Sequence, residues 1–338
     1  MSVEILIGDC RERLSELPDQ SVHCCVTSPP YFGLRDYGHG EQIGLEPTPD
    51  DFVAALVEVF REVRRVLRDD GTIWLNLGDS YNNAGSNRNG EGLDNRRRGG
   101  ASGPDGAVGY KKRDLRHTLR DYGIKHKDLI GTPWRVALAL QADGWYLRQD
   151  IIWHKPNPMP ESVRDRCTKA HEYIFLLSKG PRYFFDADAI KEPSVYDGPP
   201  KPGKQAQTAY TGLAVHSGQL GVGGADGKRN KRSVWTISTK PFKGAHFATF
   251  PPDLIEPCIL AGCPQGGTVL DPFGGAGTTG LVAQAHGRNA ILCELNPEYA
   301  ALARERIDEA TATPLERRQI VGRRAKPCQD MHQTSLFG

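Results

Sequence analysis

The stretch that decides the fold is VLDPFGGAGTTG, residues Val269–Gly280. An apolar run ends at Asp271, a glycine-rich turn follows, and an apolar segment with helical spacing begins near Gly277. A strand, a glycine loop and a helix in this order are typical of the cofactor-binding turn of open α/β sheets. The spacing Gly275-x-Gly277-x-x-Gly280 matches the dinucleotide fingerprint, and the next strand ends at Glu294, where a ribose-binding acid is expected. The alternative is a packing turn that binds no ligand.

Asp271 narrows the choice of cofactor. A pyrophosphate is bound by bare backbone N–H groups at a helix N-terminus, and a carboxylate directly before the glycines would repel it. The same carboxylate could hold an ammonium group, while Glu294 accepts hydrogen bonds from ribose hydroxyls. A cofactor with an amino-acid head and a ribose satisfies both acids, so we predict S-adenosyl-L-methionine. The loop is not a P-loop, because no lysine follows the glycines.

The alternation of strands and helices extends through most of the chain. Short apolar runs bounded by turn residues predict strands, and apolar residues at helical spacing predict helices. The strand at 22–26, the helix at 51–68 and the strand at 72–77 follow one another in the order strand–helix–strand, which implies a parallel sheet. The predicted strands are 3–7, 22–26, 72–77, 147–153, 173–177, 268–271 and 290–294, and the predicted helices are 51–68, 128–142, 252–261, 277–286 and 297–310.

Two basic segments interrupt this pattern. Residues 82–127 hold eleven Lys and Arg against five acids, and residues 187–245 hold nine against four. Neither has visible periodicity, so we expect the first to be a long mobile loop and the second to be irregular. Such surplus charge favours contact with nucleic-acid phosphates over a merely solvated surface. The candidate DNA-binding residues are Arg96, Arg97, Arg98, Lys111, Lys112, Arg113, Lys228, Arg229, Lys231 and Arg232.

A second motif follows the predicted strand at 22–26. The sequence VTSPPYFGL, residues 26–34, ends that strand with a hydroxyl, two prolines and an aromatic ring. Prolines stop a strand and stiffen the backbone that follows. Open α/β sheets bind their ligands beyond the carboxyl ends of their strands, so this rigid loop is a candidate site.

Three stretches together resemble the amino-group DNA methyltransferases, which modify N4 of cytosine or N6 of adenine. They are TSPPY at 27–31, DPFGGAGTTG at 271–280 and ELNPEY at 294–299. Their order, catalytic motif early and cofactor motif late, resembles the circularly permuted beta group. The resemblance implies a Rossmann-like α/β fold with a doubly wound, mostly parallel seven-stranded sheet, S-adenosyl-L-methionine as cofactor and double-stranded DNA as substrate.

The resemblance also divides the chain. Residues 1–81, 128–186 and 246–310 are expected to form the core, the first containing the catalytic half and the last the cofactor-binding half. Residues 82–127 would be a basic loop inserted in the core, 187–245 the target-recognition segment, and 311–338 a polar tail.

Individual roles follow from the same resemblance. Gly8-Asp9 resembles the motif whose acid contacts the adenine of the cofactor. The stretch HFATFPP at 246–252 resembles the segment that holds the methionine part of the cofactor. The stretch DIIWHKP at 150–156 resembles the strand and turn beside the target-base pocket. No metal ligand is expected. The expected catalytic residues are Ser28, Pro29, Pro30 and Tyr31, and the expected cofactor-binding residues are Asp9, Thr249, Phe250, Asp271, Phe273, Gly274, Gly275, Gly277 and Glu294.

The TSPPY loop offers groups that could activate a weak nucleophile. The lone pair of an exocyclic amine is conjugated with its ring, so the amine is a poor nucleophile. The Ser28 hydroxyl and the Pro29 carbonyl would accept hydrogen bonds from the amino hydrogens and so draw the nitrogen toward tetrahedral geometry. Tyr31 would stack on the flipped base. Among the enzymes that the chain resembles, a serine at the position of Ser28 is more often found in those that modify cytosine N4, so the resemblance favours that target, and adenine N6 is the alternative. From other classes, a nucleotide-binding oxidoreductase would leave TSPPY unexplained, and a non-catalytic DNA-binding module ranks third.

The remaining features concern location and partners. No apolar run approaches the ~20 residues of a membrane span, and no secretory signal is visible at the start of the sequence. Eight cysteines without a CxxC pair fit reduced thiols, so we expect a cytoplasmic protein of bacterial or phage origin. Gln333, Leu336 and Phe337 resemble the peptide that docks on the bacterial sliding clamp, a candidate partner. The recognition sequence, the oligomeric state and the existence of a cognate restriction endonuclease stay open.

Overall fold

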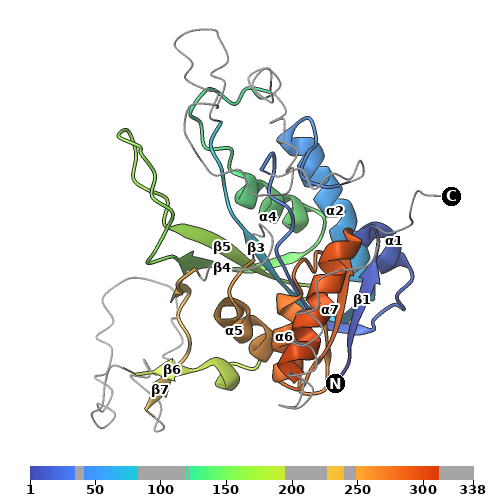
Figure 1. The fold of residues 1–338 in the computed structure, drawn as a ribbon. Helices are drawn as coiled ribbons and strands as arrows, with labels where there is room; N and C mark the ends of the chain where they lie inside the picture. Colours follow the sequence, from blue (N-terminus) through green and yellow to red (C-terminus); the bar gives the residue numbers. More distant parts are fainter. Residues whose placement is uncertain (35–41, 83–118, 120–121, 195–226, 240–248, 312–338) are drawn as a thin grey trace, which may run out of the picture.

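The computed structural model describes residues 1–34, 42–82, 119, 122–194, 227–239 and 249–311. Within these residues, eight strands form one large sheet in the order β1-β10-β9-β2-β3-β5-β4-β8, and β6 and β7 form a separate pair (Figure 1). The strands are β1 (Val3–Ile7), β2 (Val22–Thr27), β3 (Leu67–Leu77), β4 (Tyr146–His154), β5 (His171–Ser178), β6 (Glu192–Pro193), β7 (Lys228–Arg229), β8 (Val234–Thr236), β9 (Thr268–Asp271) and β10 (Asn289–Glu294).

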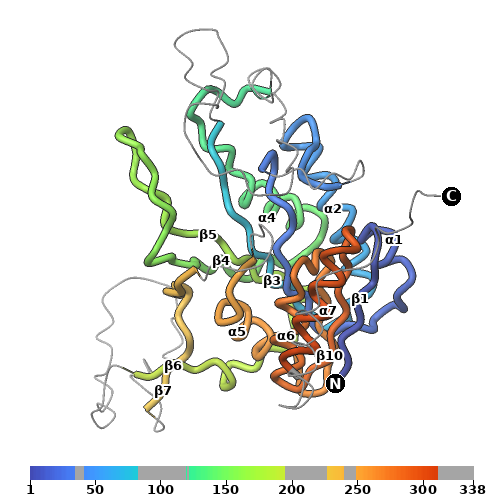
Figure 2. The backbone as a smooth tube through the Cα atoms, viewed as in Figure 1, coloured from blue at the N-terminus to red at the C-terminus, as the bar shows by residue number. Residues whose placement is uncertain are grey.

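The sheet joins the two ends of the described chain. Val3 of β1 pairs in parallel with Ala290 of β10, and the two strands lie side by side in the backbone trace (Figure 2). The strands from β1 to β3 are all parallel neighbours, and β5 is antiparallel to both β3 and β4. The predicted doubly wound, mostly parallel α/β sheet is therefore confirmed, with eight strands instead of seven. The additional strand is β8, which pairs with β4 through Val234–Thr236.

Helices cover both faces of the sheet, as the alternating side chains of β2 require. Cys25 belongs to a core cluster with residues of α1, α2 and α4, whereas Cys24 and Val26 belong to a second cluster with residues of α5, α6 and α7. Successive side chains of a strand point to opposite faces, so a strand buried on both sides reads as a continuous apolar run. The helices are α1 (Cys10–Ser15), α2 (Pro49–Val66), α4 (Thr132–Ala142), α5 (Pro252–Gly262), α6 (Thr278–Ala285) and α7 (Pro297–Thr311), with a 3₁₀ turn, η2 (Asp188–Ile190).

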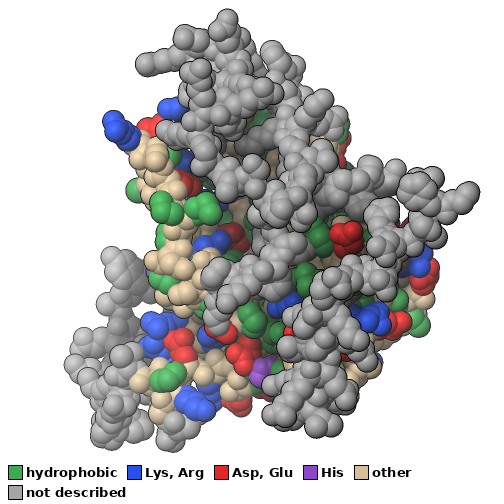
Figure 3. Space-filling model, in the orientation of Figure 1, with side chains coloured by type: hydrophobic (Ala, Val, Ile, Leu, Met, Phe, Trp, Pro, Cys, Tyr) green, Lys and Arg blue, Asp and Glu red, His purple; other side chains and the backbone are tan. Residues whose placement is uncertain are grey.

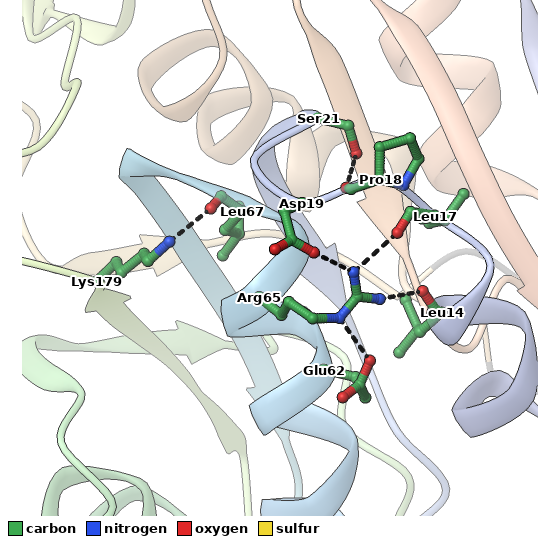
Figure 4. A network of polar contacts seen from close by, with 9 residues as sticks. All are labelled: Leu14, Leu17, Pro18, Asp19, Ser21, Glu62, Arg65, Leu67 and Lys179. Carbon is green, nitrogen blue, oxygen red and sulfur yellow. Dashed lines mark hydrogen bonds and ion pairs between the residues drawn. The ribbon is translucent and has the colours of Figure 1, made fainter.

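The end of α2 is fixed by Arg65. This side chain donates to the carbonyls of Leu14 and Leu17 at 2.7 and 2.9 Å and pairs with Asp19 at 2.5 Å, which ties α2 to the turn after α1 (Figure 4). The helix stops at Val66 because Leu67 is extended, with φ −70° and ψ 140°. Strand β3 consequently begins five residues before the predicted start at Thr72.

Several sequence predictions lie outside the described residues. These are the mobility and phosphate contacts of Arg96–Arg98 and Lys111–Arg113, most of the target-recognition segment, His246–Ala248 of the methionine-binding segment, and Gln333, Leu336 and Phe337 of the tail. In the described part of the chain, none of the helices has the length and apolarity required to cross a membrane.

Candidate active site

A cavity opens at the carboxyl edge of the sheet. The parallel strands β1, β10, β9 and β2 all end here, and the connections from β9 and β2 lead to opposite sides, toward β10 and β3. This is the topological switch point at which open α/β sheets bind ligands. The cavity is lined by Gly8, Asp9, Cys10, Pro30, Gln42, Ile43, Pro272, Phe273, Gly275, Cys293, Glu294, Leu295, Asn296 and Tyr299.

Two carboxylates face this cavity. Asp9 caps the N-terminus of α1 and pairs with Arg11 at 2.5 Å, and hydrogen bonding from the Arg11 side chain lowers the pKa of Asp9 despite its partial burial. Glu294, at the end of β10, accepts the backbone N–H of Gly275 at 2.8 Å and that of Asn296 at 2.9 Å. Glu294 therefore joins the glycine loop to the start of α7 and presents a fixed acceptor at the cavity.

The other lining side chains suit the flat, apolar part of a ligand. Ile43, Phe273 and Tyr299 offer apolar and aromatic surface between the two acids. A nucleoside combines a ring system with sugar hydroxyls that need acceptors, so the cavity fits a cofactor of this chemical class. Predicted residues Asp9, Phe273, Gly275 and Glu294 are all brought together here.

The glycines of the loop pack closely against neighbouring elements. Gly277 has φ +75°, and a Cβ there would lie 2.8 Å from Ala303 Cβ of α7. A Cβ on Gly274 would lie 2.9 Å from Leu292 Cβ, and one on Gly280 2.8 Å from Val3 Cγ1. Of the glycines in this loop only Gly275 lines the cavity. Gly274 and Gly277 do not line the cavity in this structure and face neighbouring core elements instead, so their expected ligand contacts stay predictions from the sequence.

Replacing Gly277 with alanine should therefore destabilise the fold. The left-handed backbone costs about 1 kcal/mol for a residue with a Cβ, and overpacking adds about 1–3 kcal/mol. Gly266 is the matched control, since it has φ +76° but a Cβ there would have nothing within 4 Å. Urea unfolding should show a loss of about 2–4 kcal/mol for Gly277→Ala and about 1 kcal/mol for Gly266→Ala. Equal losses would contradict the packing role.

Asp271 does not reach the cavity. Its side chain is buried, accepts hydrogen bonds from the hydroxyls of Thr27 and Thr279, both at 2.6 Å, and accepts the N–H of Phe273 at 3.1 Å. Burial raises the pKa of this carboxyl above its usual value. In this structure the carboxylate is enclosed by these donors, and its expected contact with a methionine ammonium stays a prediction from the sequence. Asp271 ties β2, β9 and α6 together beneath the glycine loop.

Two further predicted cofactor residues also lie away from the cavity. Thr249 and Phe250 precede α5 and are half-buried, and Phe250 packs against the core cluster of α5, α6 and α7. Neither lines the cavity. Their prediction relied on a stretch whose first three residues, 246–248, are outside the described part of the chain.

The proline loop follows β2 at the same edge. Pro30 lines the cavity, Pro29 is buried, and Ser28 is half-buried directly after the last strand residue, Thr27. The loop thereby borders the cavity on one side. Its other side faces a polar cluster built from β3, β4 and β5.

Tyr31 connects the loop to that cluster. Its hydroxyl donates to Glu172 Oε2 at 2.8 Å, and its ring lies against Gly78, where a Cβ would be 2.6 Å from Tyr31 Cε2. Burial, and then the charge of Glu172, raise the pKa of Tyr31 well above its usual value, while a hydrogen bond from Ser28 opposes part of this rise. The predicted catalytic residues Ser28, Pro30 and Tyr31 are thus gathered between the cavity and the cluster.

Comparison with known proteins identifies the family of this chain. A family model described as DNA methylase, for N6- and N4-modifying enzymes, matches residues 22–305. The chain belongs to this DNA methylase family. Among its relatives, the type II methyltransferase M.SmaI of Serratia marcescens is 48% identical over 306 residues, which cover 90% of this chain and 91% of that protein.

Solved structures agree with the fold of this methylase. The PvuII DNA methyltransferase (cytosine-N4-specific) superposes with a TM-score of 0.60 and 20% identity over 96% of this chain and 92% of that one. A DNA modification methylase of Thermus thermophilus, complexed with S-adenosyl-L-methionine, gives a TM-score of 0.53 and 25% identity over 91% and 93%. S-adenosyl-L-methionine is the cofactor of this methylase, and the two acids and the aromatic surface of its cavity fit that molecule.

The described basic residues of the methylase are partly engaged within the fold. Arg229 and Arg232 both pair with Glu192, at 2.9 and 2.6 Å, and Lys231 lies over the ring of Trp235 at 5.1 Å. Figure 3 likewise shows basic side chains beside acidic ones around β6 and β7. With 68% of its side chain exposed, Arg232 can still reach a phosphate, whereas Arg229, at 25%, is mainly an internal partner of Glu192.

Sequence reasoning missed several residues of the site. Gln42 and Ile43 carry no motif that marks them, and Glu172 lies at the start of β5, an otherwise ordinary apolar strand. Asn296 and Tyr299 could have been found, because both belong to the ELNPEY stretch that ends β10 and begins α7.

Proposed function

We propose that the chain is a site-specific methyltransferase that transfers a methyl group from S-adenosyl-L-methionine to the exocyclic N4 of cytosine in duplex DNA. The choice of cytosine N4 as the target rests on Ser28, a neutral hydroxyl at the first position of the proline loop beside the cofactor cavity. The named activity of the PvuII enzyme agrees with this choice, although its 20% identity relates the folds alone. Adenine N6 is the alternative target.

The residues that line the cavity would bind the cofactor. Asp9 and Glu294 hold the nucleoside part of the cofactor, with Phe273, Ile43 and Tyr299 against its ring and sugar. The bound cofactor supplies an activated methyl group on a sulfonium. Its reactivity supplies the chemical driving force, so the protein mainly has to orient the two reactants.

The loop that contains Ser28 and Pro29 would make the amino group of the target base more nucleophilic. The Ser28 hydroxyl and the Pro29 carbonyl accept hydrogen bonds from the amino hydrogens, which weakens conjugation of the nitrogen with its ring and frees the lone pair. The base reaches this point only after flipping out of the duplex, at a cost of a few kcal/mol, and Tyr31 stacks on it. Buried Pro29 keeps the acceptors in place.

Expression in a methylation-deficient bacterial host tests the proposal. Sequencing of the host DNA with detection of modified bases should reveal N4-methylcytosine at one short recurring sequence, since a type II relative of high identity implies sequence-specific action. A host carrying Ser28→Ala is the control and should lack the mark. Recurring N6-methyladenine would instead support the alternative target.

Two finer proposals concern partners. The 82–127 segment would contact DNA phosphates and the 187–245 segment would contact bases, so that neutralising Arg96, Arg97 and Arg98 weakens binding to all sequences. The tail residues Gln333, Leu336 and Phe337 would bind the bacterial sliding clamp, which titration of a residue 325–338 peptide with the clamp would test. Both stay predictions from the sequence.

A further inference from the structure

The carboxylate of Glu172 is the centre of the polar cluster beside the catalytic loop. Glu172 lies near the start of β5, and only 15% of its side chain is exposed. It accepts hydrogen bonds from the Tyr31 hydroxyl at 2.8 Å and from Asn76 Nδ2 at 3.3 Å, and its second oxygen pairs with Lys155. Three donors, from β3, from the residue after β4 and from the catalytic loop, thus converge on one carboxylate.

Lys155 supplies the positive charge of this cluster through its ion pair with Glu172. Its side chain is 18% exposed, and its ammonium lies 4.2 Å from the centre of the Trp153 ring. A carboxylate with so little exposure needs a counter-charge, and a charged acceptor also makes stronger hydrogen bonds than a neutral one. Lys155 therefore supplies the charge that allows Glu172 to bind the Tyr31 hydroxyl as a carboxylate.

The ring of Tyr31 is constrained at a second point. A Cβ on Gly78, just after β3, would lie 2.6 Å from Tyr31 Cε2 and 3.2 Å from Glu172 Oε1. The absence of a side chain at Gly78 leaves the space that the ring occupies. The hydroxyl bond and this close contact together leave Tyr31 little freedom to rotate.

We propose that Glu172 is a positioning residue, which holds the Tyr31 hydroxyl so that the ring presents a fixed face to the target base. This inference rests on the proposed function, in which Tyr31 stacks on a flipped base, and holds whether that base is cytosine or adenine. Stacking on an aromatic side chain contributes substantially to the binding of an unpaired base, and misplacement by about 1 Å can cost about 100-fold in rate.

A double-mutant cycle between Tyr31→Phe and Glu172→Ala tests this role. If Glu172 acts through the Tyr31 hydroxyl, each single variant should lower kcat for DNA methylation roughly 10-fold, and Glu172→Ala should have no further effect when Tyr31 is already phenylalanine. If Glu172 only balances Lys155, its removal should cost the same factor in both backgrounds, which would overturn the proposal.

A fluorescence measurement gives a readout that is independent of turnover. A duplex with 2-aminopurine at the target position reports stacking of the flipped base on Tyr31 through quenching of its emission. Glu172→Ala should change this emission in the Tyr31 enzyme and leave it unchanged in the Tyr31→Phe enzyme. A change of equal size in both backgrounds would contradict the positioning role.

Glu172→Gln keeps the experiment decisive if Glu172→Ala does not fold. The amide retains one acceptor oxygen for Tyr31, so Glu172→Gln should keep more activity than Glu172→Ala and should be silent in the Tyr31→Phe background. A Glu172→Gln effect that persists unchanged in that background would refute the proposal. Failure of the wild-type protein to methylate any DNA would instead refute the proposed function.

Discussion

Replacing Ser28 with alanine is expected to lower the turnover number for DNA methylation by about 100-fold or more. The variant loses one of two acceptors on the amino group, so the nitrogen keeps its conjugation and its poor nucleophilicity. Misplaced or missing contacts at a reacting centre cost rates of this order. Steady-state transfer of a labelled methyl group to duplex DNA measures the loss.

Cofactor binding separates this role from a general disturbance. Ser28 does not line the cofactor cavity, so the affinity of Ser28→Ala for S-adenosyl-L-methionine should stay within about twofold of the wild type. Ser21→Ala is a matched control, because the Ser21 hydroxyl only donates to the Pro18 carbonyl at 2.7 Å in the turn before β2. Near-normal turnover in Ser28→Ala, or an equal loss in Ser21→Ala, would contradict the assigned role.

Replacing Glu294 with alanine should weaken S-adenosyl-L-methionine binding by roughly 10- to 100-fold. The variant loses the acceptor for the ribose hydroxyls and also releases the N–H groups of Gly275 and Asn296. Hydrogen bonds to a charged group contribute about 1.5–3 kcal/mol each, which corresponds to this range. Isothermal titration calorimetry with S-adenosyl-L-methionine in the absence of DNA gives the affinity directly.

Glu298→Ala serves as the control for this measurement. Glu298 is an exposed acid in the first turn of α7, four residues beyond Glu294, and does not line the cavity. Its removal should leave the affinity unchanged. Calorimetric affinities of Glu294→Ala and the wild type that agree within error would remove Glu294 from the cofactor site.

The main strands could be predicted from sequence because both faces of the sheet are buried. Residues 22–26 are apolar except for His23 and lie between turn residues, and the observed strand is Val22–Thr27. Strand β8 could not be predicted in this way. Its three residues, Val234–Thr236, lie in a basic segment without periodicity, and it depends on pairing with β4 and on burial of Trp235.

Some of the predicted cofactor residues line the cavity and others do not, for a physical reason. Motifs identified Asp9 and Glu294, which face the cavity, but a carboxylate at a strand end can point to either face of the sheet. Val269, Leu270 and Asp271 are all buried, so the alternation of side chains along β9 does not distinguish an acid that faces the cavity from one enclosed by the core. The hydroxyls of Thr27 and Thr279 that receive this acid come from distant elements.

Glu172 illustrates what sequence patterns do not contain. It is separated from Tyr31 by 141 positions and meets it only because β3 lies between β2 and β5 in the sheet. The start of β5 carries no motif that points to the catalytic loop. Such contacts depend on strand order, which the sequence pattern leaves open.

The central claim is the transfer of a methyl group to N4 of cytosine at the proline loop. Purified protein should be incubated with bacterial genomic DNA that lacks methylation and with isotopically labelled S-adenosyl-L-methionine, and the DNA should be digested to nucleosides for mass spectrometry. The expected product is labelled N4-methyl-deoxycytidine with the wild type, with a loss of at least about 100-fold for Ser28→Ala. Label found only in N6-methyl-deoxyadenosine, or in no nucleoside, would contradict the claim.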